Sequence, residues 1–362
     1  MKLYAATKAL LFALSMLLPL NGAWAGPKYK ILHAFGEGKD GSGVWGSLVF
    51  DADDNAYGTT INGGTYNFGT VFEMTPHPDG HWTEAILHDF DGGDVGSMPV
   101  DTLAIDGAGN LYGMTTTSVS GGGWVFELSP GSDGWTYTDL YNFCPPPGCY
   151  DGSEPVAPLS WDVHGNLYGT TLFGGNEPPK CLGSAGCGVA FQMTPNGDGT
   201  WTYNVLWRFA ATKTDGYYPY AGLTVDASGT AYGATWGGGK YGNGTFFKLT
   251  PTKSGLWTET ILYQFPSCAN GCGPSYTLVP DKAGNLYGSG AGGSTACGYG
   301  CGVVFKFTPQ QNGTWKYSVV HGFNGTDGAF PYGVVLDEKG NIFGATMQGG
   351  KHNMGVAFEI TP

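Results

Sequence analysis

The sequence predicts an all-β protein, a six-bladed β-propeller with four antiparallel strands in each blade. One pattern of turns and alternating apolar residues is written six times along the chain. Five copies end in a strand-like segment that the sixth copy lacks, and a segment of the same spacing stands before the first copy. A linear stack needs no strand borrowed from the other terminus. A closed ring does, because two unpaired sheet edges would otherwise remain where its ends meet.

The first two strands of each copy are joined by a hairpin with the pattern D-x-x-G-N, followed by L-Y-G. The best versions begin at Asp106, Asp162 and Asp281. Equivalent aromatic residues recur at spacings of 55, 56, 64, 55 and 56 residues, at Tyr57, Tyr112, Tyr168, Tyr232, Tyr287 and Phe343. Glycine supplies the positive φ that such a turn requires, and aspartate caps its own backbone. The hairpin aspartates are therefore predicted to be structural: Asp106, Asp162, Asp226, Asp281 and Asp337.

The third strand is predicted from six segments of the type G-x-V-F-E-L-T-P. A phenylalanine alternates with polar residues in each, which is typical of a strand with one buried face, and proline ends the segment. The segments are 69–76, 123–130, 188–195, 244–251, 302–309 and 355–362. The fourth strand runs from a tryptophan to a phenylalanine, in 82–90, 135–143, 201–209, 257–265 and 315–323. These tryptophans recur at one structural place, so we expect them to pack between blades.

The predicted organisation is a secretory leader, 1–25, followed by one propeller domain, 26–362. The repeats are about 36–90, 91–143, 144–209, 210–265, 266–323 and 324–362, the last completed by 27–35. In this interpretation residues 29–35 form the fourth strand of the last blade. The leader has two lysines, an apolar stretch too short to span a bilayer comfortably, and an A-x-A cleavage motif at 23–25. We therefore expect a secreted, periplasmic or extracellular protein without a transmembrane segment in the mature chain.

The composition limits the classes of partner. Removal of residues 1–25, which contain two lysines and no acidic residue, changes the net charge from −13 to −15. This charge argues against nucleic acid and anionic membranes as partners. The 64 glycines accompany 14% strongly periodic aromatic residues, so they indicate tight β-turns and not disorder. The oligomeric state is left open.

The pair of motifs G-N-L-Y-G-T-T and G-x-V-F-E-L-T-P resembles the GloVer tandem repeat of exported bacterial proteins. The resemblance covers roughly residues 27–362 and implies an extracellular or envelope-associated repeat protein. The resemblance does not indicate any particular activity. Members often carry a C-terminal anchoring segment, whereas this sequence ends on a predicted strand.

One face of the ring is predicted to carry the variable loops. These are the loops between the fourth and first strands and between the second and third strands, and variation on one face of a repeat array usually marks the binding face. All eight cysteines fall in these loops, at Cys144, Cys149, Cys181, Cys187, Cys268, Cys272, Cys297 and Cys301. We expect four local disulfides, with pairing between neighbouring loops of a blade as the alternative. Zinc is disfavoured because no C-x-x-C pair is present.

The same face carries the candidate ligand-binding residues. They are aspartates of the F-x-G-x-D-G-x-x-P loops and aromatic residues: Asp40, Asp94, Asp151, Asp215 and Asp327, with Trp45, Tyr217, Tyr218, Trp236 and Phe330. Exposed flat rings beside carboxylates are suited to stacking on sugars. The competing interpretations are Asx-turns for the aspartates and loop packing for the rings. No cofactor or metal is expected, with Ca²⁺ held by the loop aspartates as the alternative.

The function predicted from these observations is non-enzymatic binding or scaffolding. The partner would be a glycan, or a component of the cell envelope or extracellular space, held by the variable face. No catalytic residue is predicted, since the sequence has no nucleophile elbow, phosphate loop or zinc motif. The alternative is a polysaccharide lyase or glycoside hydrolase with its active site at the channel mouth of that face, an analogy at the level of the fold.

Overall fold

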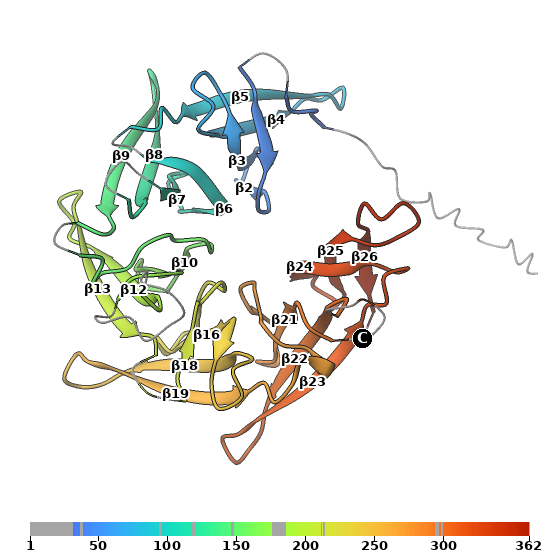
Figure 1. Ribbon diagram of the computed structural model, residues 1–362. Coiled ribbons are helices and arrows are strands. Elements are labelled where there is room, and N and C mark those ends of the chain that lie inside the picture. Colours follow the sequence, from blue (N-terminus) through green and yellow to red (C-terminus); the bar gives the residue numbers. More distant parts are fainter. Residues whose placement is uncertain are drawn as a thin grey trace, which may run out of the picture. The chain divides into compact units, whose positions relative to one another are not determined.

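The computed structural model describes residues 32–36, 39–93, 96–117, 121–145, 148–175, 186–210, 212, 214–293, 297 and 300–361. The chain divides into two units, 1–34 and 35–362. The predicted leader lies outside the described residues. The second unit is a six-bladed β-propeller whose small antiparallel sheets follow one another around a ring (Figure 1). The predicted fold class is thus confirmed.

The sheets repeat one order, in which each strand pairs with the next along the chain. Blade 1 contains β1 (Gly41–Val44), β2 (Val49–Phe50), β3 (Ala56–Gly63), β4 (Thr70–Pro76) and β5 (Trp82–Asp89). Blade 2 contains β6 (Ser97–Ile105), β7 (Leu111–Thr117), β8 (Trp124–Gly131) and β9 (Gly134–Asn142). Blade 3 contains β10 (Ser160–Trp161), β11 (Leu167–Thr171), β12 (Val189–Pro195) and β13 (Trp201–Arg208).

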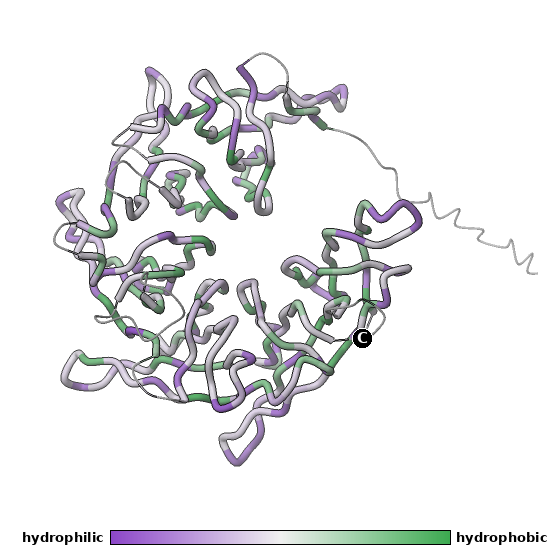
Figure 2. The backbone as a smooth tube through the Cα atoms, viewed as in Figure 1, coloured by the Kyte–Doolittle hydropathy of each residue, from purple (hydrophilic) through white to green (hydrophobic). Residues whose placement is uncertain are grey.

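The last three blades have the same order. Blade 4 contains β15 (Thr224–Val225), β16 (Ala231–Thr235), β18 (Thr245–Pro251) and β19 (Trp257–Gln264), with β14 (Gly216–Tyr217) paired to β17 (Gly237–Gly238). Blade 5 contains the short helix η1 (Cys268–Asn270), β20 (Val279–Pro280), β21 (Leu286–Gly290), β22 (Val303–Pro309) and β23 (Trp315–Gly322). Blade 6 contains β24 (Ala329–Leu336), β25 (Ile342–Gln348) and β26 (Ala357–Ile360). Figure 2 shows a hydrophilic tip on the hairpin β22–β23 at the outer rim.

The hairpin aspartates organise the turn between the first and second paired strands. In blade 2, Oδ1 of Asp106 accepts hydrogen bonds from the backbone N–H groups of Ala108 and Asn110, at 2.8 and 2.9 Å. Its Oδ2 accepts from Asn110 Nδ2 at 2.9 Å and from the Tyr112 hydroxyl at 3.2 Å. The turns at Asp162 and Asp281 have the same bonds. The structural role predicted for these aspartates is confirmed.

Large aromatic side chains fill the junctions between blades. The tryptophan that begins a fourth strand packs against the second-strand tyrosine of the preceding blade. The ring pairs are Tyr57–Trp135, Tyr112–Trp201, Tyr168–Trp257 and Tyr232–Trp315, with centroids 5.7 to 6.2 Å apart. The third-strand phenylalanines are buried, among them Phe72, Phe126, Phe191, Phe247 and Phe305. The packing role predicted for the tryptophans is confirmed at these junctions.

A backbone hydrogen bond joins consecutive blades on the variable-loop face. The residue before the proline of each G-x-x-P motif donates its N–H to a carbonyl just before the third strand of the preceding blade. The donor–acceptor pairs are Met98–Phe68, Glu154–Gly122, Tyr218–Cys187, Gly273–Asn243 and Phe330–Cys301, at 2.8 to 3.2 Å. To make this bond the donor residue adopts a left-handed backbone, with φ between 53° and 57°. Four of the five donors therefore hold a conformation that costs L-residues free energy.

The predicted closing strand is not observed. Residues 29–31 lie outside the described residues, residues 32–36 form no strand, and the described part of blade 6 has three strands. Phe35 nevertheless packs on Phe72 of blade 1, with ring centroids 4.8 Å apart. At the other junctions the phenylalanine that follows a fourth strand packs on the third-strand phenylalanine of the next blade. These pairs are Phe90–Phe126, Phe143–Phe191, Phe209–Phe247, Phe265–Phe305 and Phe323–Phe358.

Candidate functional site

A pocket of about 690 Å³ lies on the variable-loop face, and blades 1 to 5 all contribute to its wall. Its aromatic lining consists of Trp45, Phe173, Tyr218, Tyr220, Trp236 and Tyr276. Its aliphatic lining consists of Ile61, Met98, Val100, Val156 and Leu172. The remaining lining residues are Asp101, Thr116 and Ser275. A concave, largely apolar site with few polar groups is typical of small-molecule and ligand pockets.

The lining residues come from two places in the repeat. One set lies where the first strand begins, at Met98, Tyr218 and Ser275, and the other where the second strand ends, at Thr116, Phe173 and Trp236. Both places belong to the face of the variable loops. The ring arrangement therefore brings together residues that are up to 231 positions apart in the chain, from Trp45 to Tyr276.

The aromatic wall contains rings that meet edge to face. The ring centroids of Tyr220 and Trp236 are 6.5 Å apart, and those of Phe173 and Tyr218 are 5.4 Å apart, with interplanar angles of 68° and 80°. Trp45 and Trp236 are 46% and 48% exposed, so their surfaces remain accessible to a ligand. The backbone N–H of Trp236 donates to the carbonyl of Tyr218 at 3.0 Å, which couples the two loops.

Within the part of the chain that the structure describes, Asp101 is the one acidic residue that lines this pocket. The strand β6 loses its register with β7 between Val100 and Ala104, and Asp101 stands in this irregular segment with φ 62°. Its Oδ1 accepts hydrogen bonds from the N–H and the hydroxyl of Thr102, at 2.7 and 3.2 Å. Bulges of this kind re-aim a side chain and are frequent next to functional sites, as is left-handed backbone in residues other than glycine.

Burial raises the pKa of Asp101 to about 6, even though the bonds from Thr102 act in the opposite direction. Among the described residues, no lysine, arginine or histidine forms an ion pair with this carboxylate. A carboxyl group that is desolvated without a compensating charge favours its neutral form. In a pocket such a group is a candidate functional residue.

Tyr276 occupies the place in blade 5 that Asp101 occupies in blade 2, two residues after the proline of the G-x-x-P motif. Its ring centroid lies 5.0 Å from that of Tyr332. Burial raises the pKa of Tyr276, and Tyr332 and the negative charge of Asp101 raise it further. The two residues from opposite blades therefore face a shared space.

Asp101 and Tyr276 were missed among the sequence candidates. A usable indication was present, because the equivalent place in repeats 3 and 4 holds the small residues Ala157 and Ala221, both fully buried. A carboxylate and a phenol depart from the repeat at a position that holds alanine in repeats 3 and 4 and glycine, Gly333, in repeat 6. Departures of this kind are not required for the packing of the blades and so point to function.

The pocket brings together three of the ten predicted ligand-binding residues, Trp45, Tyr218 and Trp236. Tyr217 and Phe330 instead pack against the hydrophobic clusters of neighbouring blades. Asp94 lies outside the described residues. The other four aspartates take part in local hydrogen bonding of their loops and do not line this pocket: Asp40, Asp151, Asp215 and Asp327.

Those loop aspartates share a pattern of contacts. Asp151 accepts a hydrogen bond from the Tyr141 hydroxyl at 2.7 Å, and Asp215 accepts one from Trp207 Nε1 at 3.2 Å. In each case the donor lies near the end of the preceding fourth strand, as does His321, whose Nε2 lies 3.1 Å from Asp327 Oδ2. These bonds fix the path from one blade to the next, in agreement with the structural interpretation.

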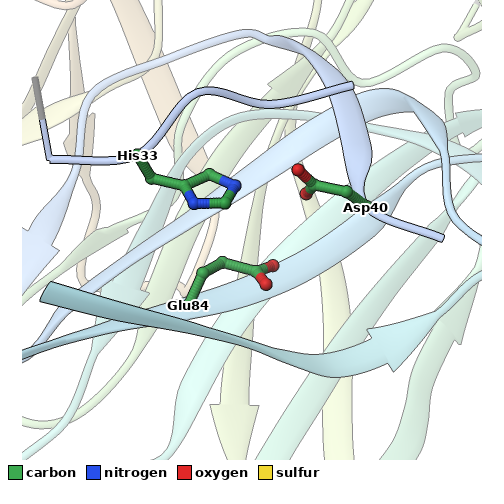
Figure 3. Close-up of side chains that lie close together, drawn as sticks. All are labelled: His33, Asp40 and Glu84. Atoms are coloured by element: carbon green, nitrogen blue, oxygen red, sulfur yellow. The ribbon is translucent and has the colours of Figure 1, made fainter. Parts of the chain in front are cut away.

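Two of these loop aspartates lie beside a glutamate of a fourth strand. Glu259 is paired with Asp215, and burial, followed by the charge of Asp215, raises the pKa of Glu259 to about 9. In blade 1 the carboxylate oxygens of Asp40 and Glu84 lie within 4.8 Å of one another, and Figure 3 shows both groups facing the same space. Two carboxylates supply fewer oxygen ligands than the six to eight that Ca²⁺ takes. Calcium binding stays a prediction.

The cysteines form local disulfides within single loops. The observed pairs are Cys144–Cys149, Cys268–Cys272 and Cys297–Cys301, and Cys187 is also disulfide-bonded. Local pairing is thus confirmed for three bridges. Cys181, the predicted partner of Cys187, lies outside the described residues. Within the described part of the chain, no helix has the length and apolar character needed to cross a bilayer.

Comparison with known families identifies the repeat. The Gloeobacter/Verrucomicrobia repeat matches residues 21–178 and 181–362. The chain belongs to this family. The resemblance recognised from the G-N-L-Y-G-T-T and G-x-V-F-E-L-T-P motifs is therefore confirmed over nearly the whole sequence. No curated protein matches the chain.

Solved structures share the fold of this Gloeobacter/Verrucomicrobia repeat protein at low sequence identity. A putative 6-phosphogluconolactonase from Bacteroides uniformis is 14% identical, with 86% of this chain and 83% of that one covered and a TM-score of 0.50. A putative oxidoreductase (glucose dehydrogenase) from Thermus thermophilus is 16% identical, with coverage of 84% and 90% and a TM-score of 0.49. At such identities the likeness concerns the fold alone.

Proposed function

We propose that this protein is a binding propeller that holds a glycan at the pocket of its variable-loop face. The partner would be a component of the cell envelope or the extracellular space. The single observation that supports this function is the accessible aromatic wall formed by Trp45, Tyr218, Tyr220 and Trp236. Flat rings of this kind provide apolar area for sugar faces at low cost in conformational entropy.

The disulfides support the expected location. Three bridges lie in the loops of the binding face, and disulfides persist in oxidising compartments such as the periplasm and the extracellular space. Each bridge also restrains the backbone of its loop. An exported protein would meet its glycan partner in the compartment where these bonds are maintained.

A glycan array probed with the mature chain, residues 26–362, tests this proposal. The variants Trp45→Ala and Trp236→Ala should lose binding to any retained glycan, because each removes a ring from the pocket. The matched control is Tyr66→Ala, since Tyr66 is 56% exposed and does not line the pocket. Absence of any retained glycan from a folded protein, or equal loss in the control, would contradict the proposal.

Enzymatic cleavage of a polysaccharide is the second candidate function, and the raised pKa of Asp101 is the observation that favours it. Two observations weigh against it. Glycoside hydrolases use a pair of carboxyl groups, whereas Asp101 is the one acidic residue of the lining in the described ranges. A lyase acting on uronic acids would benefit from basic residues, and the lining residues that the structure describes include none. The test is to incubate the protein with polysaccharides and measure the release of reducing ends or unsaturated sugars. Release by the wild type that is lost in Asp101→Asn would establish enzymatic cleavage.

A further inference from the structure

We propose that the pocket selects a ligand that carries an organic cation, an ammonium group placed between the Asp101 carboxylate and the aromatic wall. This inference rests on the proposed binding function and names the ligand class for the same site. It covers a primary amine, as in an amino sugar, and a quaternary ammonium group. Both present the same chemistry, a diffuse positive charge surrounded by CH or NH groups.

The charge of the pocket is unbalanced in the absence of a ligand. Among the described residues Asp101 is the only acidic residue of the lining, and none of these lining residues is a lysine, arginine or histidine. The hydrogen-bond donors that reach its carboxylate from the described residues are the N–H and the hydroxyl of Thr102, and both reach Oδ1. The protein therefore desolvates this carboxylate without supplying a counter-charge, and a ligand cation would supply it.

The aromatic wall suits the same group. Cations are attracted to the faces of aromatic rings, most strongly to tryptophan, and quaternary ammonium ligands are held in aromatic cages. Trp45 and Trp236 are about half exposed beside the pocket. The rings of Tyr220 and Trp236 meet edge to face, so their planes lie at a steep angle to each other. Rings set at steep angles enclose a compact cation better than a stack of parallel rings.

Other ligand chemistries fit less well. An anion would meet Asp101, and no basic residue of the described lining would offset the repulsion. A divalent metal ion would find one carboxylate in a predominantly apolar wall, far fewer oxygen ligands than Ca²⁺ requires. The net charge of about −15 on the mature chain adds a long-range attraction for cations.

The cation would bind the ionised form of Asp101. Since the pKa of Asp101 is raised to about 6, the affinity should fall as the pH is lowered from 7 to 5, where the carboxyl group becomes protonated. The titratable group that faces Asp101 across the ring is Tyr276, whose own raised pKa keeps its phenol neutral in this range. Thr102, on the same strand, and Thr59, which bonds to the Asp101 carbonyl, do not titrate.

Calorimetry on the mature chain with choline and 3,3-dimethylbutan-1-ol tests the inference. The second compound has the shape of choline, with carbon in place of the charged nitrogen. Choline should bind about tenfold more tightly, within the range known for desolvated cation–aromatic contacts. Asp101→Asn should remove most of this difference in affinity, and Trp236→Ala should weaken the binding of choline. Asp133→Asn, a change in the exposed β8–β9 turn on the opposite face, and Tyr66→Ala should leave both affinities unchanged.

A second pair of probes distinguishes the sources of the cation. Glucosamine tetramer carries free amines, and N-acetylglucosamine tetramer carries neutral amides on the same backbone. Preference for glucosamine tetramer over choline assigns an amino sugar, and the reverse assigns a quaternary ammonium compound. Equal binding of the charged and neutral members of both pairs overturns the inference while leaving the proposed glycan binding intact. Absence of binding by all four probes, together with a blank glycan array, overturns both.

Discussion

Asp101, Glu154 and Glu259 are carboxyl groups whose pKa values are raised by burial. Each lies on the variable-loop face or at a junction between blades. For each, desolvation is the largest cause of the raised pKa. Asp101 belongs to the pocket, whereas Glu154 holds a left-handed backbone and Glu259 pairs with Asp215. The last two serve the architecture, and substitutions that remove their charge should stabilise the fold.

Glu259→Gln should raise the free energy of unfolding at pH 8. The pKa of Glu259 in the folded state, about 9, lies far above its ordinary value of 4.5, so the folded protein binds a proton that the unfolded chain releases. The contribution of this group to stability is therefore greatest below pH 4.5 and is lost as the pH rises through about 9. Glutamine mimics the protonated acid at every pH.

Urea unfolding of the wild type and of Glu259→Gln at pH 4 and pH 8 measures this effect. The two proteins should have similar stability at pH 4, and the variant should be more stable at pH 8. Glu127→Gln in β8 is the matched control, since this carboxylate accepts a hydrogen bond from the Ser129 hydroxyl at 2.8 Å and, among the described residues, has no hydrogen bond to a second carboxyl group. A stability difference that is independent of pH would contradict the carboxyl pair.

Glu154→Gly should stabilise the protein by about 1 kcal/mol, because glycine adopts a left-handed backbone without the steric cost of a Cβ atom. Glu154 has φ 53°, and glycine already occupies the equivalent place in repeat 5, where Gly273 has the same φ. The N–H bond to the carbonyl of Gly122 would remain. Chemical denaturation measures the change, and destabilisation by the variant would show that the Glu154 side chain makes a contact worth more than the strain.

At the scale of the element, a glycine in each second strand permits the close packing of the third. A Cβ atom at Gly58 in β3 would lie 2.6 Å from Cζ of Phe72 and 2.9 Å from Cδ2 of Leu48. These distances are shorter than any normal contact. The packing therefore requires the glycine of the Y-G-T motif, because the ring of the third-strand phenylalanine lies directly against this glycine.

Gly58→Ala should lower the free energy of unfolding by roughly 1 to 3 kcal/mol, the usual cost of overpacking a dense core. Gly107→Ala is the matched control, because a Cβ atom at Gly107 in the hairpin turn would have no neighbour within 4 Å. Thermal unfolding followed by circular dichroism compares the two. A similar loss in both variants would mean that glycine acts through backbone freedom and not through packing.

At the scale of the whole molecule, the position of Phe35 bears on how the ring closes. Phe35 packs on Phe72 as the terminal phenylalanine of each fourth strand packs on the next blade. It therefore takes the place that the fourth strand of a preceding blade would take. This contact supports the prediction that residues 29–35 complete blade 6, although the strand itself stays a prediction.

Deletion of residues 26–36 should lower the unfolding temperature and promote aggregation, since it removes the Phe35 ring and leaves an unpaired edge on blade 6. A shorter deletion, residues 26–28, is the control and should have little effect, as trimming of a chain end usually has. Light scattering during a thermal ramp records both properties. Equal behaviour of the two deletions would show that the ring does not depend on this segment.

The repeated pattern by itself determined the fold class, the blade count, the hairpin turns and the face that carries the variable loops. Each of these depends on contacts close in sequence or repeated at a fixed spacing. The D-x-x-G-N turn forms from residues within six positions of one another, and the third-strand phenylalanine meets a glycine of the adjacent strand. Contacts between residues this close in sequence can be predicted from a single sequence.

Only the tertiary structure decided which loop residues share a site. Trp45, Tyr218 and Trp236 line one pocket, whereas Tyr217 and Phe330, equally plausible by sequence, pack against the hydrophobic clusters between blades. Asp101 and Tyr276 are 175 positions apart and face one another because the ring places blades 2 and 5 on opposite sides of the channel. Sequence spacing records the position of a residue within its repeat. The direction of its side chain depends on a bulge and on left-handed backbone, which the contacts between blades impose.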